Sequence, residues 1–209
     1  MYDLEEREQL DNLKDWGRQN WRWVALGAFV SAVALGLWKG YEAYQDRLAN
    51  QAGLVFEGIS EAAQKLEASQ TLSLAQSLER QQPNSEMASR GALVASAVAH
   101  AKKDDGTAIE QLNWILIHGH SQSLVDLARY RHAEILADQK KWNEAQQELS
   151  AITSPDMQAL ASDLKGDIYL LQNKLAQARQ SYQLALSKAQ PNDALRQIDQ
   201  SKINGLGGS

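Results

Sequence analysis

Four histidines are the side chains of this chain best suited to chemistry near neutral pH, because imidazole can bind a metal or carry a proton. His118 and His120 flank Gly119 at a predicted turn, but the sequence places no further ligands beside them, so an exposed turn is favoured over a metal site. His100 and His132 fall within predicted helices, where a packed or exposed imidazole is ordinary. We therefore predict no metal site.

Other signs of catalysis are also missing from the sequence. It contains no phosphate-binding loop, no Gly-x-Ser-x-Gly motif and no His-Glu-x-x-His motif. Carboxylates are frequent, and their spacing indicates scattered, solvated helix faces. The absence of cysteine excludes disulfides, thiol catalysis and a lipid anchor on cysteine. The sequence thus predicts a protein that is not an enzyme, with no catalytic residues and no cofactor.

The charge balance argues against nucleic acid as a partner. Residues 1–40 hold 5 of the 21 Lys and Arg and 6 of the 26 Asp and Glu, so the rest carries 16 bases, 20 acids and a net charge of −4. Such a surface does not attract nucleic acid, and no basic cluster in the sequence indicates binding to anionic lipid. Protein partners are the expectation that remains.

Residues 21–41, WRWVALGAFVSAVALGLWKGY, are long and apolar enough to cross a membrane, because a helix of this length rises about 30 Å. Aromatic side chains occur at both ends, as is typical of membrane interfaces: Trp21, Trp23, Trp38 and Tyr41. A cleaved signal peptide is the alternative, supported by Ala32-Val33-Ala34, but residues 1–22 carry six acids against four bases, unlike a short basic leader. An uncleaved anchor is favoured, and the tryptophans disfavour a buried helix of a soluble domain.

The bases on each side of this segment predict its orientation. Arg7, Lys14, Arg18 and Arg22 precede it, whereas Lys39 and Arg47 follow it closely. Because Lys and Arg are enriched on the cytoplasmic side, we expect a cytoplasmic N-terminus, with residues 42–209 in the periplasm of a bacterium.

A stripe of small residues follows one face of the predicted span. Ala28, Ala32, Gly36 and Gly40 are four residues apart and end in a Gly-x-x-x-Gly motif. Small residues allow close approach of a second membrane helix, so the stripe is a candidate membrane-helix contact. The alternative is the ordinary abundance of small residues in membrane helices.

The rest of the chain reads as an array of helix pairs. Helix breakers recur every 36 residues, at Pro83, Gly119, Pro155 and Pro191. Each unit has two small residues spaced by 12 positions, where two antiparallel helices would cross: Ser96 and Ala108, Ala133 and Ala145, Gly166 and Ala178. Ahead of them, an apolar stripe from Tyr44 to Leu66 predicts a long helix, and residues 72–78 predict a shorter partner.

The last unit resembles the tetratricopeptide repeat, whose signature it matches at Gly166, Tyr169, Ala178, Tyr182, Ala185 and Pro191. The predicted fold is all-α, a single N-terminal transmembrane helix followed by a tetratricopeptide-like array of antiparallel helix pairs. The expected segments are a cytoplasmic tail (1–22), the transmembrane helix (23–40), a membrane-proximal helix pair (41–83), the repeats (84–204) and a flexible C-terminus (205–209).

Four further segments carry a resemblance along nearly the whole chain: Leu13-Lys14-Asp15-Trp16 with Asn20, Leu127-Ala128-Arg129, Asp163-Leu164-Lys165-Gly166-Asp167 and Lys202-Ile203-Asn204. With these segments, the full pattern resembles the YfgM-type ancillary subunit of the SecYEG translocon. It implies a non-enzymatic inner-membrane protein that contacts SecYEG and a PpiD-type membrane-anchored chaperone. It also implies that the protein helps pass exported clients to periplasmic chaperones. A cytosol-facing repeat receptor and an envelope-complex scaffold are the alternatives.

In tetratricopeptide domains, the first helices of the pairs line a concave surface. The resemblance places there a candidate partner groove of eight residues: Arg90, Leu93, His100, Tyr130, Glu134, Asp138, Asp163 and Asp167. Their mixed polar and apolar character suits a protein segment better than a small molecule, and a merely solvated helix face is the alternative.

Overall fold

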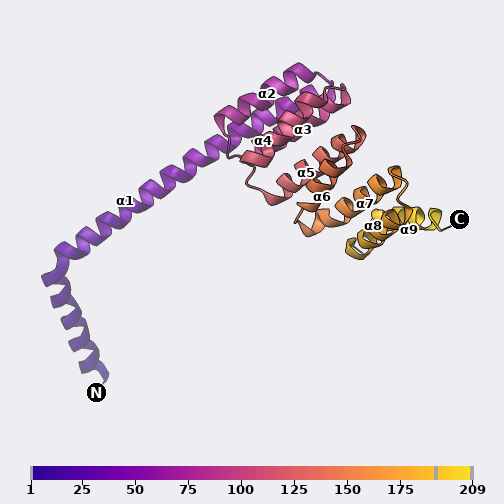
Figure 1. Ribbon diagram of the computed structural model, residues 1–209. Coiled ribbons are helices and arrows are strands. Elements are labelled where there is room, and N and C mark those ends of the chain that lie inside the picture. Colours follow the sequence, from indigo (N-terminus) through magenta and orange to yellow (C-terminus); the bar gives the residue numbers. More distant parts are fainter. Residues whose placement is uncertain (1, 191–192, 208–209) are drawn as a thin grey trace. The chain divides into compact units, whose positions relative to one another are not determined.

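The computed structural model describes residues 2–190 and 193–207, and all regular secondary structure in these ranges is helical. The chain divides into two units, Met1–Asn50 and Gln51–Ser209, which are described separately. The predicted break at Pro191 and the final two residues of the predicted flexible C-terminus lie outside the described ranges. Figure 1 shows the helices in chain order: α1 (Tyr2–Gln64), α2 (Ala68–Gln81), α3 (Glu86–Ala101), α4 (Asp105–His118), α5 (Gln122–Asp138), α6 (Trp142–Ser150), α7 (Pro155–Leu171), α8 (Leu175–Lys188) and α9 (Ala194–Gly205).

The first unit consists of the N-terminal part of α1. Between Trp16 and Gln64 this helix contains a stretch of 18 residues with a mean hydropathy of 1.5, and no part of that stretch is buried against other parts of the protein. Trp23 and Trp38, at the two ends of the apolar segment, are 74% and 72% exposed. By length and composition the helix is able to cross a membrane once, in agreement with the predicted anchor.

The second unit contains the predicted helix pairs α3–α4, α5–α6 and α7–α8, separated near Pro83, Gly119 and Pro155 (Figure 1). The end of α1 packs on α2 through a shared apolar cluster that includes Ile59 and Leu78, and α9 packs on α8 after the last pair. Consecutive pairs pack through α2 on α3, α4 on α5 and α6 on α7. This arrangement confirms the predicted all-α fold of stacked helix pairs.

Small residues explain why the two helices of each pair approach so closely. The six predicted crossing residues are all buried: Ser96, Ala108, Ala133, Ala145, Gly166 and Ala178. Gly166 is the most constrained, because a Cβ atom there would lie closer than 3.0 Å to three ring carbons of Tyr182, a side chain with no exposed surface. Only small residues fit where the two helices of a pair cross, which explains why small residues recur at these positions of the repeat.

The turn inside each pair uses one residue with a left-handed backbone. These residues are Leu66, Lys103, Lys140 and Asn173, with φ between 55° and 66°. The prediction for Leu66 was therefore wrong in placing it on the apolar stripe of α1, since the helix ends at Gln64 and Leu66 is half exposed in the turn. Tyr44, at the other end of that stripe, is also exposed, whereas Ala52 and Ile59 are buried as predicted.

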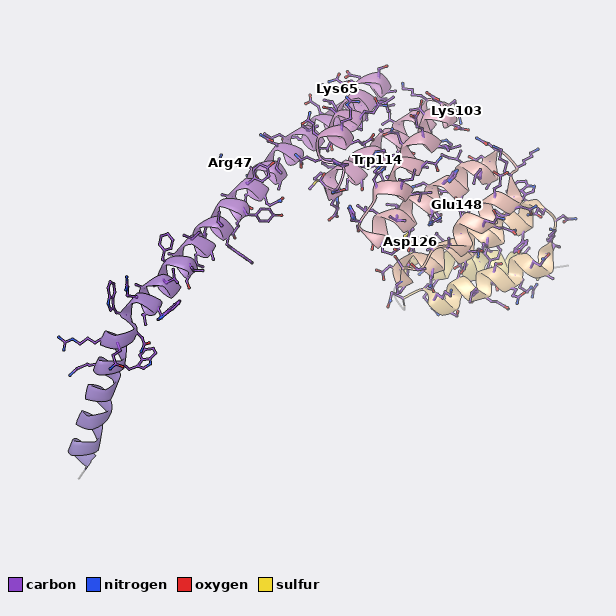
Figure 2. The ribbon with its side chains drawn as sticks, turned by 60° about the vertical axis from the view of Figure 1, so that its left-hand side comes forward. Arg47, Lys65, Lys103, Trp114, Asp126 and Glu148 are labelled. Carbon is purple, nitrogen blue, oxygen red and sulfur yellow. The ribbon has the colours of Figure 1, made fainter. Side chains whose placement is uncertain are left out.

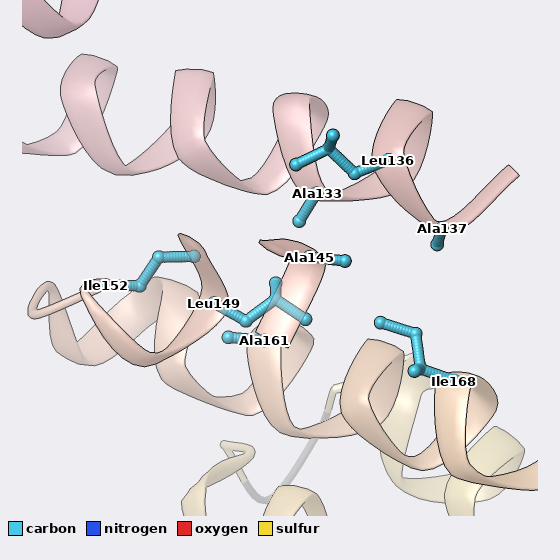
Figure 3. Packing of buried hydrophobic residues seen from close by; sticks show 8 residues of the cluster. All are labelled: Ala133, Leu136, Ala137, Ala145, Leu149, Ile152, Ala161 and Ile168. Carbon is cyan, nitrogen blue, oxygen red and sulfur yellow. The ribbon is translucent and has the colours of Figure 1, made fainter. Parts of the chain in front are cut away.

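Between consecutive pairs, apolar side chains form continuous clusters. Figure 3 shows one that joins α5, α6 and α7: Ala133, Leu136, Ala137, Ala145, Leu149, Ile152, Ala161 and Ile168. The inner face of the second helices is buried, with Leu112 and Tyr182 0% exposed and Leu149 2% exposed. Full burial of a leucine such as Leu112 stabilises the fold by about 1.5–3 kcal/mol. These clusters keep consecutive helix pairs packed, so that the first helices form one surface.

Candidate partner groove and its supporting network

The first helices of the three pairs, α3, α5 and α7, line a groove of about 700 Å³. Its apolar lining includes Leu93 from α3, Leu127 from α5, and Leu164, Ile168 and Leu171 from α7. Leu171 is 69% exposed, so part of this apolar surface faces solvent. Apolar grooves are one kind of surface that binds amphipathic protein segments.

Five of the eight predicted groove residues lie in this lining: Leu93, His100, Glu134, Asp138 and Asp167. The structure thus brings together side chains from all three pairs. Their binding of a partner stays a prediction.

The other three predicted residues lie elsewhere. Arg90 is exposed, and its Nη2 donates to Glu86 Oε1 over 2.6 Å one turn earlier on α3. Tyr130 packs against the α5–α6–α7 core, and this burial raises the pKa of its hydroxyl. Asp163 is only 8% exposed and pairs with a residue of α9.

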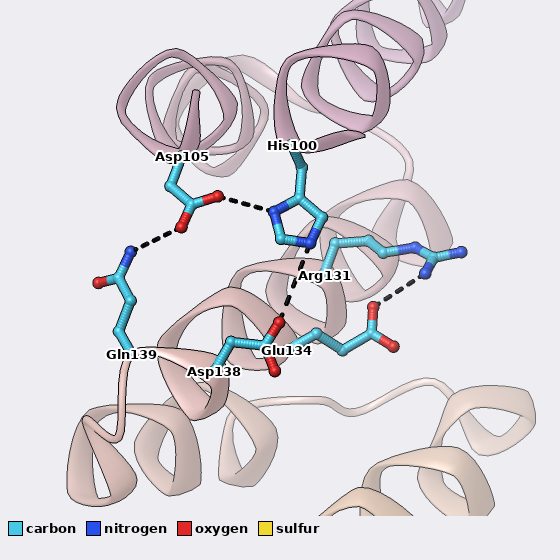
Figure 4. Close-up of polar contacts among 6 residues, drawn as sticks. All are labelled: His100, Asp105, Arg131, Glu134, Asp138 and Gln139. Carbon is cyan, nitrogen blue, oxygen red and sulfur yellow. Dashed lines mark hydrogen bonds and ion pairs between the residues drawn. The ribbon is translucent and has the colours of Figure 1, made fainter. Parts of the chain in front are cut away.

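One end of the groove is a polar network that joins two helix pairs (Figure 4). His100 Nδ1 lies 2.8 Å from Asp105 Oδ1, and His100 Nε2 lies 4.0 Å from Asp138 Oδ2 on α5. Gln139 Nε2 also donates to Asp105 Oδ2 over 3.3 Å. Hydrogen bonds from His100 and Gln139 lower the pKa of Asp105, so this carboxylate stays charged near neutral pH.

Arg131 is a groove residue that sequence reasoning missed. Its Nη1 donates to Glu134 Oε2 over 2.9 Å, so one groove carboxylate is already paired within α5. The i,i+3 spacing of the two residues was the available signal, but many exposed helix faces carry such pairs.

The α7 wall of the groove is held by α9. Lys202 Nζ donates to Asp163 Oδ1 over 2.5 Å and to Asp167 Oδ1 over 2.8 Å. Tyr182 Oη on α8 donates to the same Asp167 oxygen over 2.7 Å, and Lys202 Nζ lies 5.0 Å from the centre of the Tyr182 ring. Asp167 is therefore positioned by two helices that do not line the groove.

Asp199 of α9 is fully buried beside this network. Burial, together with the neighbouring Asp163 carboxylate, raises the pKa of Asp199 to about 7. Burial opposes the charge on Lys202, but its hydrogen bonds with Asp163 and Asp167 raise the pKa of its ammonium group. The cluster thus favours protonation of the Asp199 carboxyl, while the lysine stays charged.

The prediction that carboxylates lie on solvated faces was therefore wrong for Asp163 and Asp199, and also for Asp126, which has no exposed surface. Asp126 accepts hydrogen bonds from the backbone N–H groups of Thr153 and Ser154 over 3.0 and 2.7 Å. Burial alone would raise its pKa, but these bonds lower it. Asp126, labelled in Figure 2, therefore ties α5 to the residues just before α7.

The remaining histidines contact neighbouring side chains, and His118 and His120 are exposed. His118 stacks on Trp114 with ring centres 4.8 Å apart, and His120 Nε2 lies 3.2 Å from Asn84 Oδ1. His132 Nδ1 lies 3.3 Å from Glu148 Oε1. Within the described residues, no group of three or more His, Cys, Asp and Glu side chains is arranged to hold a metal ion.

The sequence profile of the tetratricopeptide repeat-like domain matches residues 14–208. A protein of Neisseria gonorrhoeae named "Ancillary SecYEG translocon subunit" is 31% identical over 207 residues, which is 97% of this chain and 98% of the relative. The chain belongs to the family of ancillary SecYEG translocon subunits. A Haemophilus influenzae protein of the same name is 22% identical over 98% of this chain and 99% of its own length. This family is not enzymatic, as the sequence predicted.

The structure gives a physical reason for two of the segments that suggested this translocon-subunit family. Asp163-Leu164-Lys165-Gly166-Asp167 and Lys202-Ile203-Asn204 lie 35 or more residues apart in the chain, but Lys202 contacts both aspartates. Gly166 lies between those aspartates and admits the Tyr182 ring. The sequence did indicate that Asp163 and Asp167 share one helix face and could bind one cation. It did not indicate that the cation would be Lys202, because α9 lies far along the chain.

Proposed function

We propose that this protein is a membrane-anchored periplasmic adapter of the SecYEG translocon, which helps pass exported proteins to periplasmic chaperones. The observation that carries the proposal is similarity along 97% of the chain to a relative named as an ancillary SecYEG subunit. The groove across α3, α5 and α7 supports a role in binding protein segments. The single apolar helix supports an anchor in the bacterial inner membrane.

The proposed segments are those expected from the sequence: a cytoplasmic tail of residues 1–22, a span over 23–40, a membrane-proximal pair over 41–83 and repeats over 84–204. Tethering is the proposed mechanism. Anchoring the groove in the membrane that contains the pore raises its effective concentration for emerging chains, so weak contacts suffice. A PpiD-type chaperone, other periplasmic chaperones and exported clients are the proposed further partners.

Orientation is tested with single cysteines, because the chain has none of its own. Glu8→Cys lies before the span, and Ser123→Cys replaces an exposed residue of α5 with a similar side chain. In intact spheroplasts, an impermeant thiol reagent should label position 123 and leave position 8 unlabelled until the membrane is opened. The reverse pattern would instead favour a cytosol-facing repeat receptor.

The membrane-helix contact is tested at the small-residue stripe of Ala28, Ala32, Gly36 and Gly40. A Cβ atom at Gly36 or Gly40 would meet nothing within 4 Å, so replacing both with leucine leaves the packing within the chain unchanged. Gly27→Leu is the matched control, since Gly27 is equally open and lies about 180° around the helix from Gly36. The double variant should lose SecYEG on co-purification while the control keeps it. Equal recovery from both variants would show that the stripe is not the contact.

A further inference from the structure

We infer that the groove across α3, α5 and α7 takes an apolar peptide segment that carries lysine or arginine side chains. This inference rests on the proposed function, in which the groove binds protein segments, and names the chemistry of the occupant. It follows from the charges that line the groove and from the partners those charges already have.

The lining carries more negative than positive charge. Its carboxylates are Glu134, Asp138 and Asp167, and its guanidinium is Arg131, so these three acids and one base sum to a formal charge of −2. An occupant that buries these groups without compensating them is disfavoured, because a charge removed from water requires a partner of opposite sign. The groove therefore disfavours acidic segments and favours basic ones.

Internal pairing identifies the carboxylate that is open to an occupant. Glu134 is paired with Arg131, and Asp167 is held by Lys202 and Tyr182. The Asp138 side chain, by contrast, is 75% exposed, and its Oδ2 lies 4.0 Å from His100 Nε2, too far for a hydrogen bond. His100 also lies 2.8 Å from Asp105, so two carboxylates share one imidazole at this end of the groove. A cationic side chain placed beside Asp138 would supply the charge that is missing.

The apolar part of the groove determines the length and the apolar character of the occupant. Leu93, Leu127, Leu164 and Leu171 come from all three first helices, so a segment must cross all three to cover them. Neighbouring packed helices lie about 8–10 Å apart, which gives a path of about 20 Å. That distance matches about six extended residues or about thirteen helical ones. The inferred occupant is thus a short apolar segment with a basic side chain near the α3–α5 end.

Fluorescence anisotropy with two designed peptides tests the inference on the full chain in mild detergent. Both peptides are leucine- and alanine-rich helices of about thirteen residues, labelled with fluorescein, and they differ only in two positions. One peptide has lysine at both positions and its twin has glutamate. At low ionic strength, the lysine peptide should bind about tenfold more tightly than the glutamate twin, with a smaller ratio at high salt.

Substitutions in and outside the groove test whether the peptides bind there. Asp138→Asn should weaken binding of the lysine peptide about two- to fivefold and strengthen binding of its twin. Glu57→Gln, an exposed carboxylate of α1 outside the groove, should change neither affinity. Leu171→Gln should weaken both peptides, whereas its neighbour Leu170, which is exposed but does not line the groove, tolerates the same change.

The outcomes separate this inference from the proposed function. Equal affinities for the two peptides, or tighter binding of the glutamate twin, would overturn the inferred charge preference. If Leu171→Gln still weakened both, the groove would remain a binding site for protein segments. If neither peptide bound, both the inference and the groove's role in the proposed function would fail, while the orientation and co-purification tests would stand on their own results.

Discussion

At the crossing of α7 and α8, the structure predicts that replacing a glycine with alanine destabilises the fold, which is the opposite of what helix propensity alone predicts. In the interior of a helix, replacing glycine with alanine ordinarily stabilises the fold by about 1 kcal/mol. At Gly166 the added Cβ would overlap the ring of Tyr182, which is fully buried. Gly166→Ala should therefore destabilise the protein.

The size of the effect follows from the contacts of Tyr182. Overpacking a core costs about 1–3 kcal/mol. Moving the ring aside would also stretch its 2.7 Å hydrogen bond to the Asp167 carboxylate, and a bond to a charged group contributes about 1.5–3 kcal/mol. After subtracting the propensity gain, we expect the free energy of unfolding to fall by about 2–4 kcal/mol.

Urea unfolding of the full chain in mild detergent, followed by circular dichroism, measures this change. Gly53→Ala is the matched control, because Gly53 lies within α1 and a Cβ there meets nothing within 4 Å. The control should gain about 0.5–1 kcal/mol. In a Tyr182→Leu background, the cost of Gly166→Ala should fall by at least about 1 kcal/mol. A Gly166→Ala protein as stable as the wild type would refute the close helix approach at this crossing.

Two further predictions concern the α9 network and use the same unfolding assay. Folding raises the pKa of Asp199 to about 7, so the wild type should lose stability as the pH rises from about 4 to 7. Asp199→Asn should remove that loss, so its free energy of unfolding should exceed that of the wild type by about 1–3 kcal/mol at about pH 8 and be unchanged at about pH 4. Equal gains at both pH values would contradict the raised pKa of Asp199. Lys202→Met should cost about 2–4 kcal/mol at neutral pH by leaving Asp163 and Asp167 without their cation, whereas the exposed Lys102→Met should stay within about 0.5 kcal/mol. A loss for Lys202→Met no larger than that control would show that the ion pairs are not stabilising.

The fold was largely predictable because its signals are local and repeated. Pro83, Gly119 and Pro155 punctuate the chain at equal intervals, and the small residues at the crossings recur at equal spacing within each pair. Each helix pair therefore needs only short-range information. Leu66 was misplaced because an apolar stripe does not reveal where a helix ends, and the turn needs a left-handed residue just after Gln64.

The site was only partly predictable because its polar contacts are long-range. Leu93, His100, Glu134, Asp138 and Asp167 follow from the position of the first helices, and they do line the groove. The burial of Asp163 depends on α9, which follows the last of the three helix pairs and has no counterpart in the spacing of their small residues. Asp126 was missed for the same reason, since its backbone N–H partners, Thr153 and Ser154, lie 27 and 28 residues further along the chain.

Physical association with the translocon tests the central claim most directly. The full chain, carrying an affinity tag, is isolated from native membranes in mild detergent, and bound SecYEG is measured by quantitative mass spectrometry. The control is the same chain with residues 21–41 replaced by an unrelated leucine-rich span of equal length. We predict that SecYEG is enriched with the native chain well above this control and above unrelated inner-membrane proteins. Recovery of SecYEG no greater than that of unrelated membrane proteins would contradict the proposed role.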